Sequence, residues 1–249
     1  MVSFITSFLF IFILSSSIAH ADEIENRIIQ NIQNNSITII GENHHRPESI
    51  RFFESIVNSY LKGNNCLTVA LEVASSQQLI IDHFVEGKVR VDAIKIPSMI
   101  DHSDYRSMLA GFAIMKRGGV CINIIAIDAD GKTLIRRDEW MVKIIEDQNE
   151  TMPVLALLGN LHALKKVNWS VDGPLPYFAE LLASSGHLVK SYHQVWEDKT
   201  CSSYQRKWVS PDSDQATKLI NSSLIALLNA FESESVEEVT DGVILWKCS

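Results

Sequence analysis

Short apolar runs and longer amphipathic segments alternate along this chain. The short runs are rich in Val, Ile and Leu and lack polar alternation, which is typical of strands buried on both faces of a sheet. The longer segments space their apolar residues three and four positions apart, as an amphipathic helix does. The predicted strands cover residues 36–40, 67–73, 120–127, 154–158, 187–195 and 243–246, and the predicted helices cover 47–61, 75–85, 105–115, 136–147, 176–183 and 214–231.

Strands that alternate with helices predict an α/β fold, with a mainly parallel central sheet and helices on both faces. We expect one domain from residue 22 to 249, with its site at the carboxyl ends of the strands, where open parallel sheets bind ligands. The stretch 197–213 is polar and contains Pro211. Residues 197–249 therefore belong to this domain or form an appended helix and closing strand.

The amino-terminal segment predicts export. Residues 1–21 contain no Asp, Glu, Lys or Arg, and an apolar run over 4–14 leads to Ala19, His20 and Ala21. This is the pattern of a signal peptide cleaved after Ala21; the alternative, an uncleaved anchor, would have a short run for a bilayer. We expect a periplasmic or secreted protein that contacts the membrane only through this segment during export.

In an oxidising compartment, four cysteines favour two disulfides, which can be paired in three ways. We favour Cys201 with Cys248, because both lie in the last quarter of the chain. Cys66 then pairs with Cys121, each near the start of a predicted strand. The alternative is four buried free thiols.

Composition narrows the function. Lys+Arg 22 against Asp+Glu 30 gives a net charge of −8, which argues against a nucleic-acid binder, since such a protein needs a basic face. A hydrophobic fraction of 46% argues against disorder. The expected partner is a small-molecule or peptide substrate.

Chemically capable side chains follow four of the predicted strands. Glu42 and His44 follow the first, Glu72 ends the second, Asp128 ends the third and His162 follows the fourth. Each alone has an ordinary interpretation, such as a helix cap, a turn or a surface ion pair. Burying several at one edge is costly unless they pair or bind something, so together they predict a functional site.

The two histidines lie in similar turns, Gly-x-x-His at 41–44 and at 159–162. With Glu42 or Glu72, two imidazoles could hold a divalent metal such as Mn or Zn with an open position for water. Without metal, one imidazole could act as general base, oriented by a carboxylate. The expected catalytic residues are His44, Glu42, Glu72 and His162. If metal is used, its expected ligands are His44, His162 and Glu72. The residues expected to contact substrate are His45, Arg106, Asp128, Arg137 and Asn160.

These motifs resemble the superfamily that joins erythromycin esterase-like proteins, ChaN-like haem-binding proteins and Tiki-type metalloproteases. The resemblance covers residues 36–247 and rests on the turns at 41–44 and 159–162, the strand end at 70–72, the residues 104–106, Asp128, the segment 137–141 and the last strand at 241–244. It implies an α/β fold with its site at the strand ends.

The branches of this superfamily imply different chemistry. The esterase-like branch implies a metal-independent hydrolase in which His44 activates water, with Glu42, Glu72 and His162 around it. The Tiki-type branch implies a metal on His44, His162 and Glu42 or Glu72. The ChaN-like branch implies haem bound through a tyrosine, and no particular tyrosine of this chain matches.

We therefore expect an exported hydrolase of ester, lactone or peptide bonds. The alternatives are a haem- or metal-binding uptake protein without catalysis, and a secreted protein that keeps the fold but has lost activity. The chain is shorter than the esterase pattern and leaves less material for a lid, which disfavours erythromycin as substrate.

Overall fold

The structure is a computed structural model that describes residues 23–148, 151–171, 173, 175–198 and 200–249. The predicted signal peptide, residues 1–21, lies outside the described residues. Within the described part of the chain, no helix is long and apolar enough to cross a membrane.

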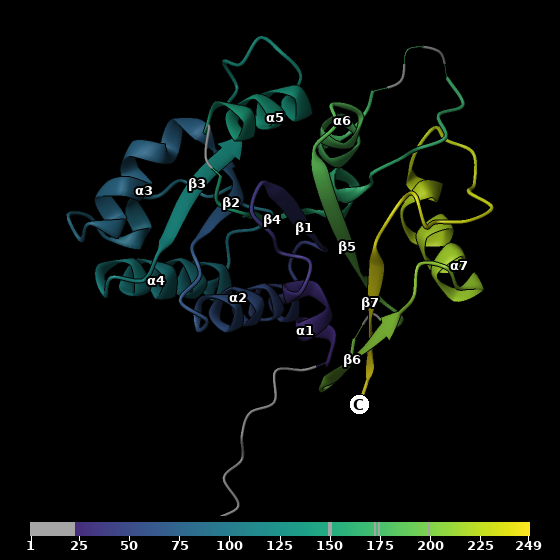
Figure 1. The fold of residues 1–249 in the computed structure, drawn as a ribbon, viewed down its shortest axis with the longest axis horizontal. Helices are drawn as coiled ribbons and strands as arrows, with labels where there is room; N and C mark the ends of the chain where they lie inside the picture. Colours follow the sequence, from purple (N-terminus) through teal and green to yellow (C-terminus); the bar gives the residue numbers. More distant parts are fainter. Residues whose placement is uncertain (1–22, 149–150, 172, 174, 199) are drawn as a thin grey trace, which may run out of the picture.

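A seven-stranded sheet forms the centre of the molecule, in the order β3-β2-β4-β1-β5-β7-β6 (Figure 1). Neighbouring strands run parallel except β7 and β6, which pair antiparallel. The carboxyl ends of the first five strands in this order, and of β7, therefore share one edge. The strands are β1 (Ser36–Glu42), β2 (Leu67–Ala74), β3 (Ile122–Asp128), β4 (Val154–Gly159), β5 (Leu188–Trp196), β6 (Tyr204–Val209) and β7 (Gly242–Cys248).

Helices cover both faces of the sheet, with α1, α2 and α4 on one side and α5 and α6 on the other (Figure 1). The helix α3 packs against α4 near β3, and α7 packs with β7 and β5 in a third cluster. The α-helices are α1 (Glu23–Ile29), α2 (Pro47–Leu61), α3 (Gln78–Val85), α4 (Ser103–Arg117), α5 (Arg137–Asp147), α6 (Phe178–Ser184) and α7 (Asp214–Ser223), and the short 3-10 turns are η1 (Ser75–Gln77), η2 (Val91–Ala93), η3 (Asn160–Ala163) and η4 (Ile225–Leu227).

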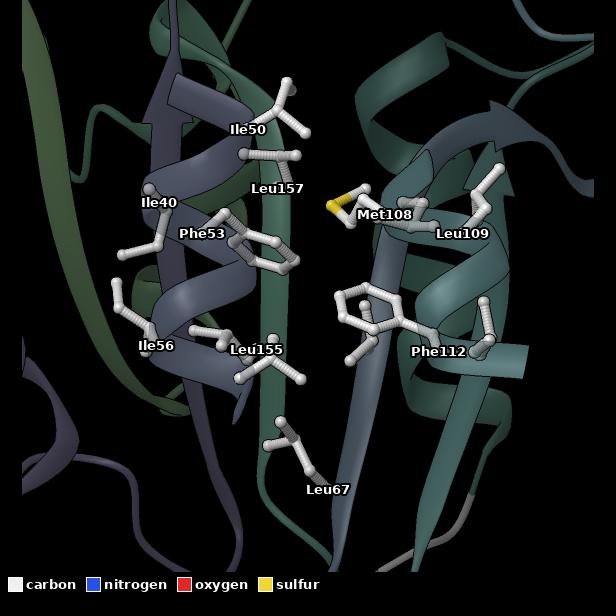
Figure 2. Close-up of a cluster of buried hydrophobic side chains, with 14 of the residues drawn as sticks. Ile40, Ile50, Phe53, Ile56, Leu67, Met108, Leu109, Phe112, Leu155 and Leu157 are labelled. Carbon is white, nitrogen blue, oxygen red and sulfur yellow. The ribbon is translucent and has the colours of Figure 1, made fainter. Parts of the chain in front are cut away.

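The largest core cluster lies between the sheet and the pair α2 and α4. Phe53 of α2 and Phe112 of α4 are completely buried and point toward each other, with ring centroids 6.4 Å apart (Figure 2). Leu155 and Leu157 of β4 belong to the same cluster and lie near Phe53. This packing makes the sheet a rigid platform for the side chains at its edge.

The α/β prediction is confirmed, and the helix over 47–61 has the predicted bounds. The helix predicted over 214–231 ends at Ser223, where the side chain of Asn221 bonds the backbone of Ser233 and the chain turns away. The strand β6 was not predicted, because its polar residues are those of an edge strand exposed on one side. It comes from the polar stretch 197–213, and β7 lies inside the sheet between β5 and β6.

Both predicted disulfides are present. Cys66–Cys121 joins the chain just before two neighbouring strands, β2 and β3, with Cα atoms 4.6 Å apart. Cys201–Cys248 ties the end of β7 to the segment before β6, with Cα atoms 5.5 Å apart. Two disulfides are typical of a protein in an oxidising, extracellular setting.

Candidate active site

The first pair of the candidate site is Glu42 and His44. Glu42 is the last residue of β1 and is only 3% exposed, and its Oε1 lies 2.7 Å from Nδ1 of His44. An ionised carboxylate can only accept, so Nδ1 donates and Nε2 is left as an acceptor. The hydrogen bond with Glu42 raises the pKa of His44 above its usual value, and burial opposes this rise.

The open face of His44 lies over Gly159 at the end of the neighbouring strand β4. A Cβ placed on Gly159 would lie 3.5 Å from Nε2 of His44 and 3.6 Å from Oε2 of Glu72. The imidazole and this second carboxylate therefore border the same small space. Only glycine leaves that space open.

Glu72 lies where the pairing of β2 becomes irregular. The register between β2 and β3 shifts between Leu71 and Ala74, and such irregularities re-aim side chains beside functional sites. Oε2 of Glu72 accepts from the backbone N–H of Gly159 at 2.7 Å, and Oε1 accepts from Arg137. Both carboxylate oxygens are thus held by the protein.

Arg137, in the first turn of α5, joins the remaining groups. Its Nε and Nη2 donate to the two oxygens of Asp128 at 2.6 and 2.9 Å, Nη2 also donates to Glu72, and Nη1 donates to Nε2 of His162 at 3.1 Å. Burial lowers the pKa of Arg137, but the hydrogen bonds and charges of Asp128 and Glu72 outweigh it and raise the pKa. The guanidinium therefore stays charged and holds two strand ends together.

His162 is occupied at both nitrogens. Because Nε2 accepts from Arg137, Nδ1 carries the proton and donates to Oδ1 of Asp138 at 2.6 Å. Asp138 is 8% exposed and also accepts from the backbone N–H of Phe178 at 2.8 Å. This arrangement fixes the ring of His162 and leaves it no free nitrogen, in contrast to His44.

The two Gly-x-x-His turns pack on each other. In the parallel register of β1 and β4, Glu42 lies beside Gly159. A Cβ on Gly41 would lie 2.4 Å from Oδ1 of Asn160, just as one on Gly159 would touch the ring of His44. Each glycine therefore makes room for the other turn, which explains the repeated spacing.

A pocket of about 350 Å³ opens above these groups. Its polar lining includes Glu42, His44, Gly159 and His162. Its apolar lining comes from the loop before α4, from η3 and from the residues that follow α7. The apolar lining residues are Met99, Leu161, Leu224 and Leu227.

Of the residues predicted to contact substrate, Arg106 and Asn160 have structural partners within the protein, and His45 is exposed. His45 is exposed and adopts a left-handed backbone (φ 64°) in the turn before α2. Arg106 forms a two-fold contact with Asp101 at 2.7 and 2.8 Å and a bond to the carbonyl of Val91. Asn160 lines the pocket, but its Nδ2 donates to the carbonyl of Gln194 and its Oδ1 accepts from the backbone N–H of Gln194.

Two residues near the site were not predicted as part of it. Asp138 follows Arg137 directly, and its position in the first turn of a predicted helix was the available signal. Tyr105 of α4 is fully buried, and its hydroxyl has no hydrogen-bond partner within the described residues. Burial raises the pKa of Tyr105, and the charges of Glu42, Glu72 and Asp128 add to this, so its hydroxyl lies within electrostatic reach of the carboxylates.

The predicted metal ligands are not arranged around a common point. Over the residues that the structure describes, three donor atoms come within 4.8 Å of one another only at Asp198, Cys201 and Cys248, and both cysteines are in a disulfide. At the candidate site, His162 and Glu72 already use their donor atoms on protein groups. The residues therefore do not fit a metal as they stand, and no step below depends on one.

Several solved structures have a fold similar to that of this chain. The chain is similar to a ChaN of Campylobacter jejuni that binds haem cofacially (TM-score 0.56, 12% identity, covering 90% of this chain and 91% of that chain). It is also similar to a mutant of erythromycin esterase EreC in its open conformation (0.60, 10%, 90% and 92%) and to a Bacillus cereus protein (0.59, 9%, 88% and 90%). No protein-family model and no curated protein sequence matches the chain. The predicted resemblance is thus confirmed at the level of the fold, which an esterase and a haem-binding protein share.

Proposed function

We propose that the protein is an exported hydrolase that cleaves an ester or related acyl bond with water activated by His44. The observation that carries this proposal is Nε2 of His44, which has no hydrogen-bond partner within the described residues and lies beside Gly159 of the pocket, while Nδ1 is held by Glu42. A buried carboxylate behind an imidazole sets the tautomer and stabilises the charge that forms during base catalysis.

The proposed step is a direct attack by water. Nε2 of His44 takes a proton from water as the water oxygen forms a bond to the carbonyl carbon of the substrate. Glu42 stabilises the resulting imidazolium. When the bond between the carbonyl carbon and the leaving oxygen breaks, the proton passes from His44 to that oxygen. The products leave as a carboxylic acid and an alcohol.

The other charged groups position the site. Arg137 holds Glu72, Asp128 and His162 in one network, and Asp138 fixes the ring of His162. Groups locked in this way cost little reorganisation when charge develops in the transition state. The fold shared with an erythromycin esterase supports a hydrolase, and the two disulfides with the apolar amino-terminal run support export.

The test is a comparison of His44→Gln with the purified mature protein on p-nitrophenyl acetate and a peptide panel. Loss of a general base should lower kcat/KM by about 10²- to 10⁴-fold. His45→Gln, in the same turn but exposed, serves as the control and should retain activity. Each assay is run with chelator, with manganese and with zinc. Full activity in His44→Gln contradicts the proposal, and activity only with added metal contradicts the metal-free step.

Haem binding is the second candidate. Tyr177 lies beside the same site, with its ring centroid 5.7 Å from that of His162 and 5.8 Å from that of Trp169. A half-buried tyrosine among aromatic rings could hold a flat apolar ligand. Titration with haem should then shift the Soret band, and Tyr177→Phe should remove the shift; an unchanged spectrum in the unaltered protein excludes this function.

A further inference from the structure

The apolar walls of the candidate pocket stay exposed although they lie beside a cluster of charges. Met99 is 56% exposed and Leu227 is 69% exposed. Both line the same 350 Å³ pocket as His44. Exposed apolar side chains gathered at a pocket mark a surface that a ligand covers.

The two segments that present these side chains are anchored. Arg106 bonds Asp101 at 2.7 and 2.8 Å and the carbonyl of Val91, which holds the loop containing Met99 against the start of α4. Leu224 and Ile225 are buried in the cluster under α7, so Leu227 is carried on a fixed turn. The apolar wall is therefore built in place.

The charges at the polar end of the pocket, near Glu42 and His44, determine what kind of ligand can bind. Glu42 lines this end of the pocket, and the carboxylates of Glu72, Asp128 and Asp138 lie next to it, bonded to Gly159, Arg137 and His162. The guanidinium of Arg137 already contacts Glu72 and Asp128. The whole chain carries a net charge of −8. A negatively charged substrate would be repelled, whereas an uncharged one would not.

We propose that this pocket selects uncharged esters with an apolar acyl chain, which lies against Met99 and Leu227 while the carbonyl carbon faces His44. This inference rests on the proposed hydrolase function and names its substrate class. The pocket volume is at the small end for ligand sites, which fits a short or medium chain and not a large ring.

The test is kcat/KM for p-nitrophenyl acetate, butyrate, hexanoate and octanoate. Burying one CH₂ is worth up to about a fourfold change, so kcat/KM should rise roughly two- to fourfold per added CH₂ until the pocket is filled. p-Nitrophenyl hemiglutarate, which ends in a carboxylate, should react at least about tenfold more slowly than butyrate.

The variant Met99→Ser with Leu227→Ser should lower the hexanoate-to-acetate ratio of kcat/KM by about tenfold. Ile114→Ser, which removes a 63% exposed side chain from α4 far along the helix, is the matched control and should leave the ratio unchanged. An unchanged ratio in the double variant, or no rise with chain length, overturns the inference while leaving the hydrolase function intact.

Binding without turnover separates the two proposals. Calorimetric titration should show hexanamide binding at least about tenfold more tightly than acetamide, and the double variant should lose this preference. If no ester is hydrolysed, the proposed function fails, but the preference for hexanamide over acetamide still tests whether the apolar wall binds an acyl chain. Equally weak binding of both amides overturns the inference about the apolar wall.

Discussion

His44 and His162 differ in how many ring nitrogens the protein occupies. Asp138 and Arg137 hold both nitrogens of His162, whereas Glu42 holds one nitrogen of His44. The repeated Gly-x-x-His pattern predicts two equivalent imidazoles, but in the structure the two imidazoles have different hydrogen-bond partners. In the proposed mechanism, His44 is therefore the base and His162 a positioning residue.

At the residue scale, the pKa of His44 predicts the pH dependence. The bond with Glu42 raises this pKa, so the base becomes protonated, and activity falls, at a pH above the usual value of about 6.5. In Glu42→Gln the pKa falls, and the acid limb of the kcat/KM profile should move to lower pH, with the plateau reduced by up to about 10⁴-fold. A pH–rate profile checks this; an acid limb that does not move would show that His44 is not the titrating base.

Arg137 supports a second residue-scale prediction. It neutralises Asp128 and Glu72, whose side chains are 9% and 7% exposed, so Arg137→Met leaves two buried carboxylates without their ion-pair partner, although each keeps a backbone N–H donor. Because the guanidinium itself is 44% exposed, we expect a loss of roughly 1–3 kcal/mol in the free energy of unfolding, below the range for a fully buried pair. Urea denaturation measures it. Arg136→Met, whose contacts are with Glu139 and a carbonyl, is the control and should lose less than about 1 kcal/mol.

At the element scale, the site depends on two neighbouring strands that each have a glycine at or next to the carboxyl end, Gly41 in β1 and Gly159 in β4. β1 and β4 pair in parallel, and each strand end accommodates the turn that follows the other. Sheet register therefore brings His44 over Gly159 and Asn160 over Gly41. The geometry of the candidate site is therefore a property of this strand pair as a unit.

Gly159→Ala should affect activity more than stability. Its φ of −55° suits alanine, but the new Cβ would lie 3.3 Å from the ring of His44 and 3.6 Å from Glu72. We expect kcat/KM to fall at least about tenfold, since small displacements of reacting groups can cost about 100-fold. Gly131→Ala, with no heavy atom within 4 Å of its Cβ, should have normal activity.

Gly41→Ala should behave differently from Gly159→Ala. Its Cβ would overlap Oδ1 of Asn160 at 2.4 Å and approach the Asn160 backbone at 3.2 Å, so the turn must move. Overpacking of this kind costs about 1–3 kcal/mol of stability, measurable by thermal unfolding. A fully stable Gly41→Ala protein would contradict the packing of the two turns.

At the scale of the whole molecule, two disulfides cross-link the chain over similar separations, 55 residues for Cys66–Cys121 and 47 for Cys201–Cys248. Chain entropy predicts that each stabilises the fold by about 4 kcal/mol, and that the two differ by less than roughly 0.2 kcal/mol. Paired Cys→Ser variants, compared by urea unfolding, test this. A much larger loss from one pair would show that its effect lies in the folded state.

The sequence by itself predicted every strand except β6, most of the helices, the favoured pairing of the four cysteines, and the edge at which Glu42, Glu72, Asp128 and the two Gly-x-x-His turns meet. Burial and periodicity are local properties, and parallel strands must bring their carboxyl ends to one side. Only the tertiary structure decided that Asp138 holds His162, that Arg106 anchors a loop, and that Met99 and Leu227 share a pocket with His44. Those outcomes depend on side-chain directions and on neighbours distant in the chain, which no local pattern encodes.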